Sequence, residues 1–140
     1  MSLKEAIIVV LEVFGECKES KLFNLLTVGH EAGMFDAGLI KWGVDCFYSQ
    51  KMYEELASLV SFGIVKQNGL RTFEINGYAE KDPQLLEFYI KVKELMISPY
   101  RIAWYFQAKK LHPDKVFNKL PDFERKKIDG LIKELNIART

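Results

Sequence analysis

Cysteine, histidine, proline and long apolar runs are all scarce in this chain of 140 residues. Its two cysteines, Cys17 and Cys46, are too few for a disulfide scaffold, which predicts a reducing, cytoplasmic setting. The longest apolar run near the start, Ile7 to Leu11, is interrupted by Glu12 and is much shorter than the roughly 20 residues that span a bilayer. No basic-then-apolar leader is present either, so we expect no targeting segment and no membrane partner.

The motifs of several enzyme classes are missing as well. The sequence has no Gly-rich phosphate loop, no G-x-S-x-G nucleophile elbow and no H-E-x-x-H zinc motif. His30, His112 and both cysteines stand singly, without the spacing of metal ligands. The pair His30-Glu31, at the end of an expected helix, is more typical of a surface pair than of a general base. We therefore predict no enzymatic activity, no catalytic residues, no cofactor and no metal site.

Apolar and charged residues are, by contrast, abundant. Hydrophobic residues make up 49% of the chain and aromatic residues 13%, which is enough for a packed core and argues against disorder. The net charge of +1 conceals an asymmetry, because residues 1–80 hold 7 Lys and Arg against 11 Asp and Glu, whereas residues 81–140 hold 13 against 8. A basic half can attract phosphate, although alternating Lys and Glu also suit a solvated helix surface.

The middle of the chain carries the clearest structural signals. Ser49 is a good N-cap for an amphipathic helix that ends near Phe62. Two β-prone runs follow, Ile64–Gln67 and Arg71–Ile75, with Asn68-Gly69 between them. Asn-Gly predicts a tight hairpin turn, since both turn positions need a positive φ. A helix followed directly by a hairpin is the second half of a winged helix-turn-helix.

Two further helices are expected before this segment. Ser2 and Glu5 have the spacing of a capping box, which predicts a first helix from about residue 3 to residue 14. A second helix is expected after Ser20, running to about Ala32. The stretch from residue 35 to residue 48 is ambiguous and fits either a third helix or a strand. Its apolar residues are expected in the core: Trp42, Val44 and Phe47.

The last 60 residues predict helices with apolar stripes. Asp82-Pro83 opens a long helix that Ser98-Pro99 ends, because Pro is tolerated in a first turn but not in a helix interior. An aromatic helix over residues 100–111 and a closing helix over residues 122–136 are expected next. These stripes are too apolar to remain in solvent. We expect them to pack on the first 80 residues, on a second copy of the chain, or on both.

Residues 20–78 resemble a family of small microbial and viral winged helix-turn-helix proteins. The resemblance implies an α+β fold, with a winged-helix domain at residues 1–80 and a C-terminal helical extension at residues 81–140. It covers about half the chain and is one of pattern. The matching pieces are Ser20-Lys21-Leu22-Phe23-Asn24-Leu25-Leu26, Trp42-Gly43, Ser49 with Leu56 and Leu59, Gly63-Ile64-Val65, and Thr72-Phe73-Glu74-Ile75.

This resemblance implies a DNA-binding protein, a small transcriptional regulator, as the first functional hypothesis. The third helix would enter the major groove of double-stranded DNA and the hairpin would lie on the backbone. A homodimer is expected, because one recognition helix reads few base pairs and two-fold symmetry doubles the site. The candidate DNA-binding residues are Gln50, Lys51 and Tyr53 on the helix and Lys66, Gln67, Asn68 and Arg71 on the wing.

A protein-interaction module on the same scaffold is the alternative. Glu54 and Glu55 follow the candidate contacts on the third helix, and the N-terminal half is acidic, which opposes binding to phosphate. The aromatic run Trp104-Tyr105-Phe106 fits an interface as well as a core. The charge around the third helix discriminates the two hypotheses, since a positive surface favours DNA and a neutral or negative one favours a protein.

A second, local resemblance lies near the C-terminus. His112-Pro113-Asp114, preceded by Lys109-Lys110-Leu111, resembles the loop of J-domain co-chaperones that engages an Hsp70 ATPase. It would imply a co-chaperone form of the interaction module. A proline-containing break between two helices is the simpler interpretation of these residues, because it requires no function.

Overall fold

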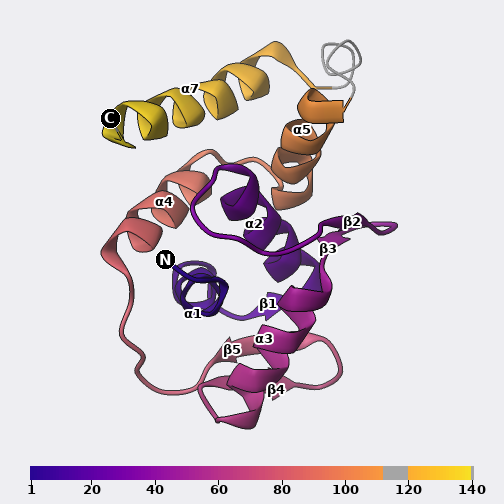
Figure 1. Cartoon of the computed structure of the whole chain (residues 1–140), viewed down its shortest axis with the longest axis vertical. Coiled ribbons are helices and arrows are strands. Elements are labelled where there is room, and N and C mark those ends of the chain that lie inside the picture. The colour runs from indigo at the N-terminus through magenta and orange to yellow at the C-terminus, as the bar shows by residue number, and fades with distance from the viewer. Residues whose placement is uncertain (112–119, 140) are drawn as a thin grey trace.

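The computed structural model describes residues 1–111 and 120–139, which form an α+β arrangement of helices and small antiparallel sheets (Figure 1). The motif His112-Pro113-Asp114 therefore lies outside the described residues. In chain order the elements are α1 (Leu3–Phe14), β1 (Cys17–Lys18), α2 (Glu19–Glu31), β2 (Lys41–Trp42), β3 (Phe47–Tyr48), α3 (Gln50–Ser61), β4 (Val65–Asn68), β5 (Thr72–Ile75), α4 (Pro83–Glu94), α5 (Pro99–Leu111) and α7 (Asp122–Arg139).

Local capping signals set where three of the helices begin. The Ser2 hydroxyl accepts the Glu5 N–H at 3.2 Å while the Glu5 carboxylate accepts the Ser2 N–H at 3.0 Å, so the predicted capping box is confirmed. Ser49 caps α3 by accepting the N–H of residue 52, and Asp82 caps α4 with proline in the first turn. These caps satisfy backbone N–H groups that have no partner inside a helix.

The hairpin predicted as a wing is confirmed as a hairpin, β4–β5, but its turn differs from the prediction. Asn68 pairs with Thr72 across the β4–β5 ladder, so the turn consists of Gly69, Leu70 and Arg71 rather than Asn68-Gly69. Gly69 alone among these residues has a positive φ, of 72°. A three-residue hairpin needs only one left-handed position, and glycine supplies it without steric cost. β1 then joins β5, which gives a three-stranded sheet of order β1-β5-β4.

The ambiguous stretch before α3 forms a loop and a second short hairpin, β2–β3, which projects from the body of the molecule in Figure 1. Phe47 is buried, as predicted. The same prediction was wrong for Trp42 and Val44, because the Trp42 ring is about half-exposed and Val44 is 100% exposed in the turn. Trp42 lies on the same face as its cross-strand partner Phe47, and its ring packs against Phe47 on one side while the rest remains in solvent. Val44 lies in the turn, where no described residue covers it.

Two helices after residue 80 pack on helices before it: α4 lies against α1 and α5 lies against α2. Leu85, Phe88 and Tyr89 are fully buried there. The Tyr89 hydroxyl donates to the backbone carbonyl of Leu25 at 2.8 Å, which satisfies its polar group inside the core. The apolar stripe of α4 is thus covered within one chain, and a homodimer would have to use other residues.

None of the described helices is long and apolar enough to cross a membrane. The longest, α7, has 18 residues and alternates charged with apolar side chains. Its buried residues Ile128 and Leu131 face the body of the protein, while Lys126 and Lys133 are exposed. This is the pattern of an amphipathic surface helix.

Candidate functional site

One face of α3 is open to solvent. Met52, Leu56 and Leu59 are buried and hold the helix against the core, whereas Gln50, Tyr53, Glu54 and Ala57 are exposed. This division follows from the helical period, which places residues three and four apart on the same side. Any partner that approaches α3 therefore meets these exposed residues first.

The three candidate DNA contacts on α3 already have partners within the chain. The Gln50 amide donates to a Glu54 carboxylate oxygen at 3.3 Å. The Tyr53 hydroxyl donates to a Glu19 carboxylate oxygen at 3.1 Å. The Lys51 ammonium donates to the backbone carbonyl of Asp36 at 3.0 Å and so lies along the loop before β2. Two of these three residues therefore bind a carboxylate.

The candidate contacts on the wing are engaged in a similar way. Lys66 lies 3.9 Å from a Glu74 carboxylate oxygen across the hairpin. The Asn68 amide donates to a Glu16 carboxylate oxygen at 2.9 Å, and the Gln67 amide donates to the backbone carbonyl of residue 70 at 2.9 Å. Arg71 has an exposed side chain, while its backbone carbonyl accepts the N–H of residue 19 at 2.7 Å. That last bond places the wing turn beside the start of α2.

The wing turn, the start of α2 and α3 therefore form one surface. We call it the α3 face and define it by Gln50, Tyr53 and Glu54 on α3, Glu16 and Glu19 beside β1, and Leu70 and Arg71 in the wing turn. Burial, and then the Glu19 carboxylate, raise the pKa of Tyr53. The phenol thus remains a hydrogen-bond donor at neutral pH.

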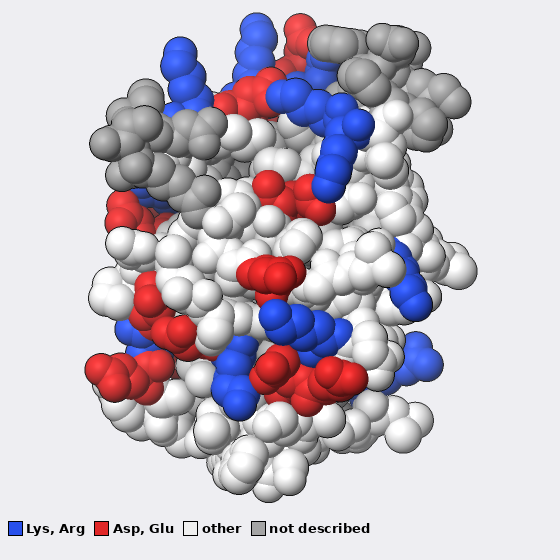
Figure 2. Space-filling view, in the orientation of Figure 1, with Lys and Arg blue, Asp and Glu red and all other residues white. Residues whose placement is uncertain are grey.

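Charges of both signs alternate over the visible side of the molecule (Figure 2). Its lowermost part, where the β4–β5 hairpin lies, is mostly free of charge. On the α3 face Glu16, Glu19 and Glu54 face the candidate donors, and Glu74 lies beside Lys66. The α3 face is therefore not positively charged, whereas a positive surface would favour DNA as the ligand.

Large apolar side chains are exposed on and beside the α3 face. Leu70 is 90% exposed in the wing turn and Tyr53 is 42% exposed on α3. Tyr48 of the β2–β3 hairpin meets the Tyr53 ring at a centroid distance of 6.1 Å, which extends the surface onto that hairpin. Trp42 points to the other side of the hairpin, where its ring meets Phe47 at 4.8 Å. The α3 face thus combines exposed apolar side chains with carboxylates.

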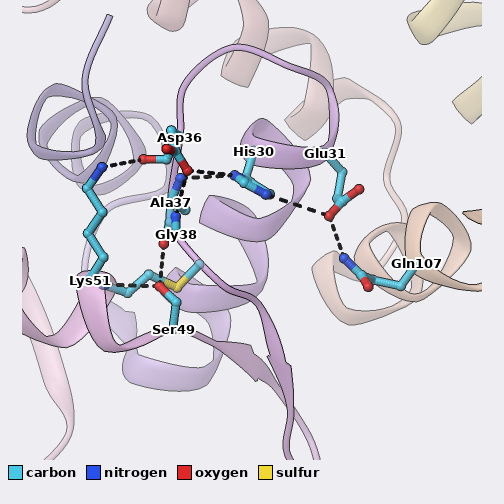
Figure 3. A network of polar contacts seen from close by, with 9 residues as sticks. His30, Glu31, Asp36, Ala37, Gly38, Ser49, Lys51 and Gln107 are labelled. Carbon is cyan, nitrogen blue, oxygen red and sulfur yellow. Dashed lines mark hydrogen bonds and ion pairs between the residues drawn. The ribbon is translucent and has the colours of Figure 1, made fainter.

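A polar network fixes the start of α3 (Figure 3). The loop before β2 is bound from two sides at Ala37: its N–H donates to His30 Nδ1 at 2.9 Å, and its carbonyl accepts the Ser49 hydroxyl at 2.5 Å. Asp36 accepts the N–H of residue 38 at 2.8 Å, and this bond, with Lys51, lowers the pKa of its carboxyl. The sequence identified Ser49 as a cap and His30 as part of a surface pair, but no local pattern links the two.

Neither a metal site nor a known family defines this surface. Among residues 1–111 and 120–139, no group of three His, Cys, Asp or Glu side chains is placed to hold a metal ion. Comparison with protein-family models, curated proteins and solved structures found no match. The function must therefore be inferred from the geometry of the α3 face.

Proposed function

We propose that residues 1–80 form a winged helix that serves as a protein-interaction module, and that the α3 face is its binding surface. The observation that carries the proposal is the pairing of the polar side chains on this face with carboxylates. These contacts leave an acidic and apolar surface where a DNA-binding winged helix requires a positive one.

The order of the elements supports the winged-helix part of the proposal. A helix, a short strand, two helices and a hairpin follow one another as α1, β1, α2, α3 and β4–β5. The hairpin lies beside the third helix, and the early strand pairs with the second strand of the hairpin. The β2–β3 hairpin is inserted between α2 and α3, where a helix-turn-helix usually has a short turn.

Electrostatics support a protein partner over a nucleic acid. Double-stranded DNA carries about one negative charge per 1.7 Å of its axis, and Lys or Arg must neutralise it. Here Lys66 faces Glu74, Lys51 is held by a backbone carbonyl, and Glu54 projects from the exposed side of α3. Arg71 is exposed on this face, but Glu16, Glu19 and Glu54 outnumber it, so a phosphate backbone there would meet more carboxylates than cations.

The chemistry of the face also indicates the kind of partner. Tyr53 and Leu70 supply aromatic and aliphatic area, and aromatic side chains anchor many protein interfaces. The carboxylates of Glu16, Glu19 and Glu54 surround this area and would complement Lys or Arg on a partner. We therefore propose a partner surface that presents apolar side chains flanked by basic ones.

A random peptide library displayed on phage tests this proposal directly. The library is selected on the whole chain alone, and the enriched peptides are then measured against a Tyr53→Ser, Leu70→Ser double variant. We expect enriched peptides to combine Leu, Phe or Trp with Lys or Arg, and to bind the double variant at least about tenfold more weakly. Acidic peptides, or peptides that bind both proteins equally, would contradict the proposal.

A matched control separates the α3 face from exposed apolar residues in general. Ile90 on α4 is 42% exposed, the same fraction as Tyr53, and Phe123 on α7 is also exposed. The double variant Ile90→Ser, Phe123→Ser therefore removes comparable apolar surface elsewhere. It should bind the selected peptides as the unchanged chain does.

A small DNA-binding regulator is the second candidate, and the order of elements together with the exposed Arg71 favours it. In this candidate Gln50, Lys51 and Tyr53 contact the major groove and the wing contacts the backbone. Mobility shifts with random duplex DNA at low salt test it. Binding that weakens steeply with salt, and that Lys51→Glu with Arg71→Glu abolishes, would establish DNA as the ligand and contradict a protein partner.

A further inference from the structure

Ala37 occupies a critical position in the loop that joins α2 to the β2–β3 hairpin. Its N–H donates to the His30 ring and its carbonyl accepts the Ser49 hydroxyl, which in turn caps α3 (Figure 3). The backbone of one buried residue thus connects the last turn of α2 to the first turn of α3. Whatever changes the bond at His30 also acts on the cap of α3.

The bond at His30 requires a neutral ring. An imidazole nitrogen accepts a hydrogen bond only when it carries no proton, so Nδ1 must be bare and the single proton must lie on Nε2. A protonated ring carries N–H groups on both nitrogens. The Nδ1–H would then point at the N–H of Ala37, and the 2.9 Å contact would become repulsive.

Carboxylates near the ring of His30 can accept hydrogen bonds from its protonated form. Asp36 lies 3.9 Å from Nδ1, and Glu31 lies 3.9 Å from Nε2. From α3 the Lys51 ammonium is held by the Asp36 carbonyl, and from α5 the neutral Gln107 amide donates to Glu31. The ring itself is partly open to water, with 23% of its side chain exposed, so a proton can reach it.

We propose that His30 is a proton-operated latch on the start of α3. The neutral ring holds Ala37 and, through it, the hydroxyl of Ser49. The protonated ring turns toward Asp36 and Glu31, releases the Ala37 N–H and loosens the cap of α3. Acidification favours the protonated ring, so lowering the pH opens the latch.

The latch rests on the proposed function only for its consequence, since Tyr53 lies one turn beyond the cap and would move with it. Acidification should therefore weaken the peptides selected on the α3 face. The structural part of the proposal is independent of any partner. If no peptide were found, the latch would still be testable in the free chain.

Nuclear magnetic resonance of the whole chain tests the latch without a ligand. At about pH 8 the ring nitrogens of His30 should report the tautomer with its proton on Nε2. Between about pH 8 and about pH 5 the hydrogen-exchange protection factor of the Ala37 amide should fall at least about tenfold, together with that of Met52. A proton on Nδ1 at high pH, or an unchanged protection factor after the ring has titrated, would overturn the proposal.

The variant His30→Asn supplies the matched control. An asparagine oxygen reaches roughly the place of Nδ1 and accepts a hydrogen bond, but its amide does not titrate in this range. The variant should retain protection at Ala37 and lose its pH dependence. If the same pH-dependent loss persisted in a folded His30→Asn chain, another group would be responsible and the latch would be wrong.

Discussion

Two tyrosines show how differently the two sides of this molecule use the same side chain. Tyr89 is fully buried between α4 and α2, and its hydroxyl is satisfied by a backbone carbonyl. Tyr53 is exposed on α3, and its hydroxyl is satisfied by a carboxylate that also faces solvent. A ring buried with its hydroxyl paired contributes to stability, whereas an exposed ring with a readily exchanged partner is available for recognition.

The contrast extends to the surrounding residues. Around Tyr89 the helices α1, α2, α4 and α5 bury most of their apolar side chains. Around Tyr53 the wing turn and the β2–β3 hairpin expose Leu70 and Val44. The helical side accounts for the stability of the fold, and the α3 side accounts for the surface that a partner can contact. Four predictions can sharpen or break this comparison.

The largest effect is expected at Leu85, which is 0% exposed on α4. Leu85→Ala should lower the free energy of unfolding by about 2–5 kcal/mol, through lost burial and a residual cavity. Leu70→Ala, in the exposed wing turn, should change it by no more than about 0.5 kcal/mol. Urea unfolding of both variants measures the difference. Equal effects would mean that Leu70 is structural and would remove it from the α3 face.

A smaller loss is expected where α2 approaches α4. A Cβ at Gly29 would lie 2.4 Å from the Tyr89 hydroxyl and 2.5 Å from the Phe35 ring. Gly29→Ala should therefore cost about 1–3 kcal/mol, because a packed core resists added volume. Gly130 on α7 is the control, since nothing lies within 4 Å of its added Cβ. Gly130→Ala should instead stabilise the protein by up to about 1 kcal/mol in thermal unfolding.

The cap of α3 ranks third. Ser49→Ala removes the acceptor for the N–H of residue 52 and leaves the Ala37 carbonyl without its donor, so we expect a loss of about 1–2 kcal/mol. Ser2→Ala removes a similar cap at the exposed start of α1 and should cost about 0.5–1 kcal/mol. Chemical denaturation compares the two. A larger loss at Ser2 would contradict the coupling of Ala37 to α3.

The smallest effect concerns thiol reactivity and leaves stability unchanged. Burial raises the pKa of both Cys17 and Cys46, so each has less thiolate at neutral pH than a free cysteine. Their modification should accelerate as the pH rises toward those pKa values. Cys46 is partly exposed whereas Cys17 is buried, so mass spectrometry after iodoacetamide treatment should find Cys46 labelled first. Faster labelling of Cys17 would mean that β1 opens readily.

Local chemistry accounts for the parts of the fold that the sequence predicted. Caps at Ser2, Ser49 and Asp82 and the β-prone runs around Asn68-Gly69 act over a few residues, so they are visible in one chain. The sequence did not predict the β2–β3 hairpin, because each of its strands has only two residues and so shows no periodicity. Without a visible hairpin, Val44 was predicted to lie in the core, although it is exposed in the turn.

The candidate site was harder to predict, because its character depends on contacts between distant residues. Asn68 meets Glu16 across 52 positions, and Tyr53 meets Glu19 across 34. The sequence showed that the N-terminal half is acidic, but not that its carboxylates lie against the candidate DNA contacts. That arrangement, rather than the residues' identities, is the reason we propose a protein partner instead of DNA.

The position of α2 has a consequence for how this protein can be dissected. Helix α2 packs against α5, which lies after residue 80, and also against α1, β1 and β3, which lie before it. It therefore belongs to the cores of both halves of the chain. A fragment that ended at residue 80 would expose Leu25 and the groove at Gly29 that Tyr89 fills. Residues 1–80 therefore share part of their core with the helices that follow them. Experiments on the α3 face should therefore use the whole chain, in which α2 keeps its neighbours on both sides.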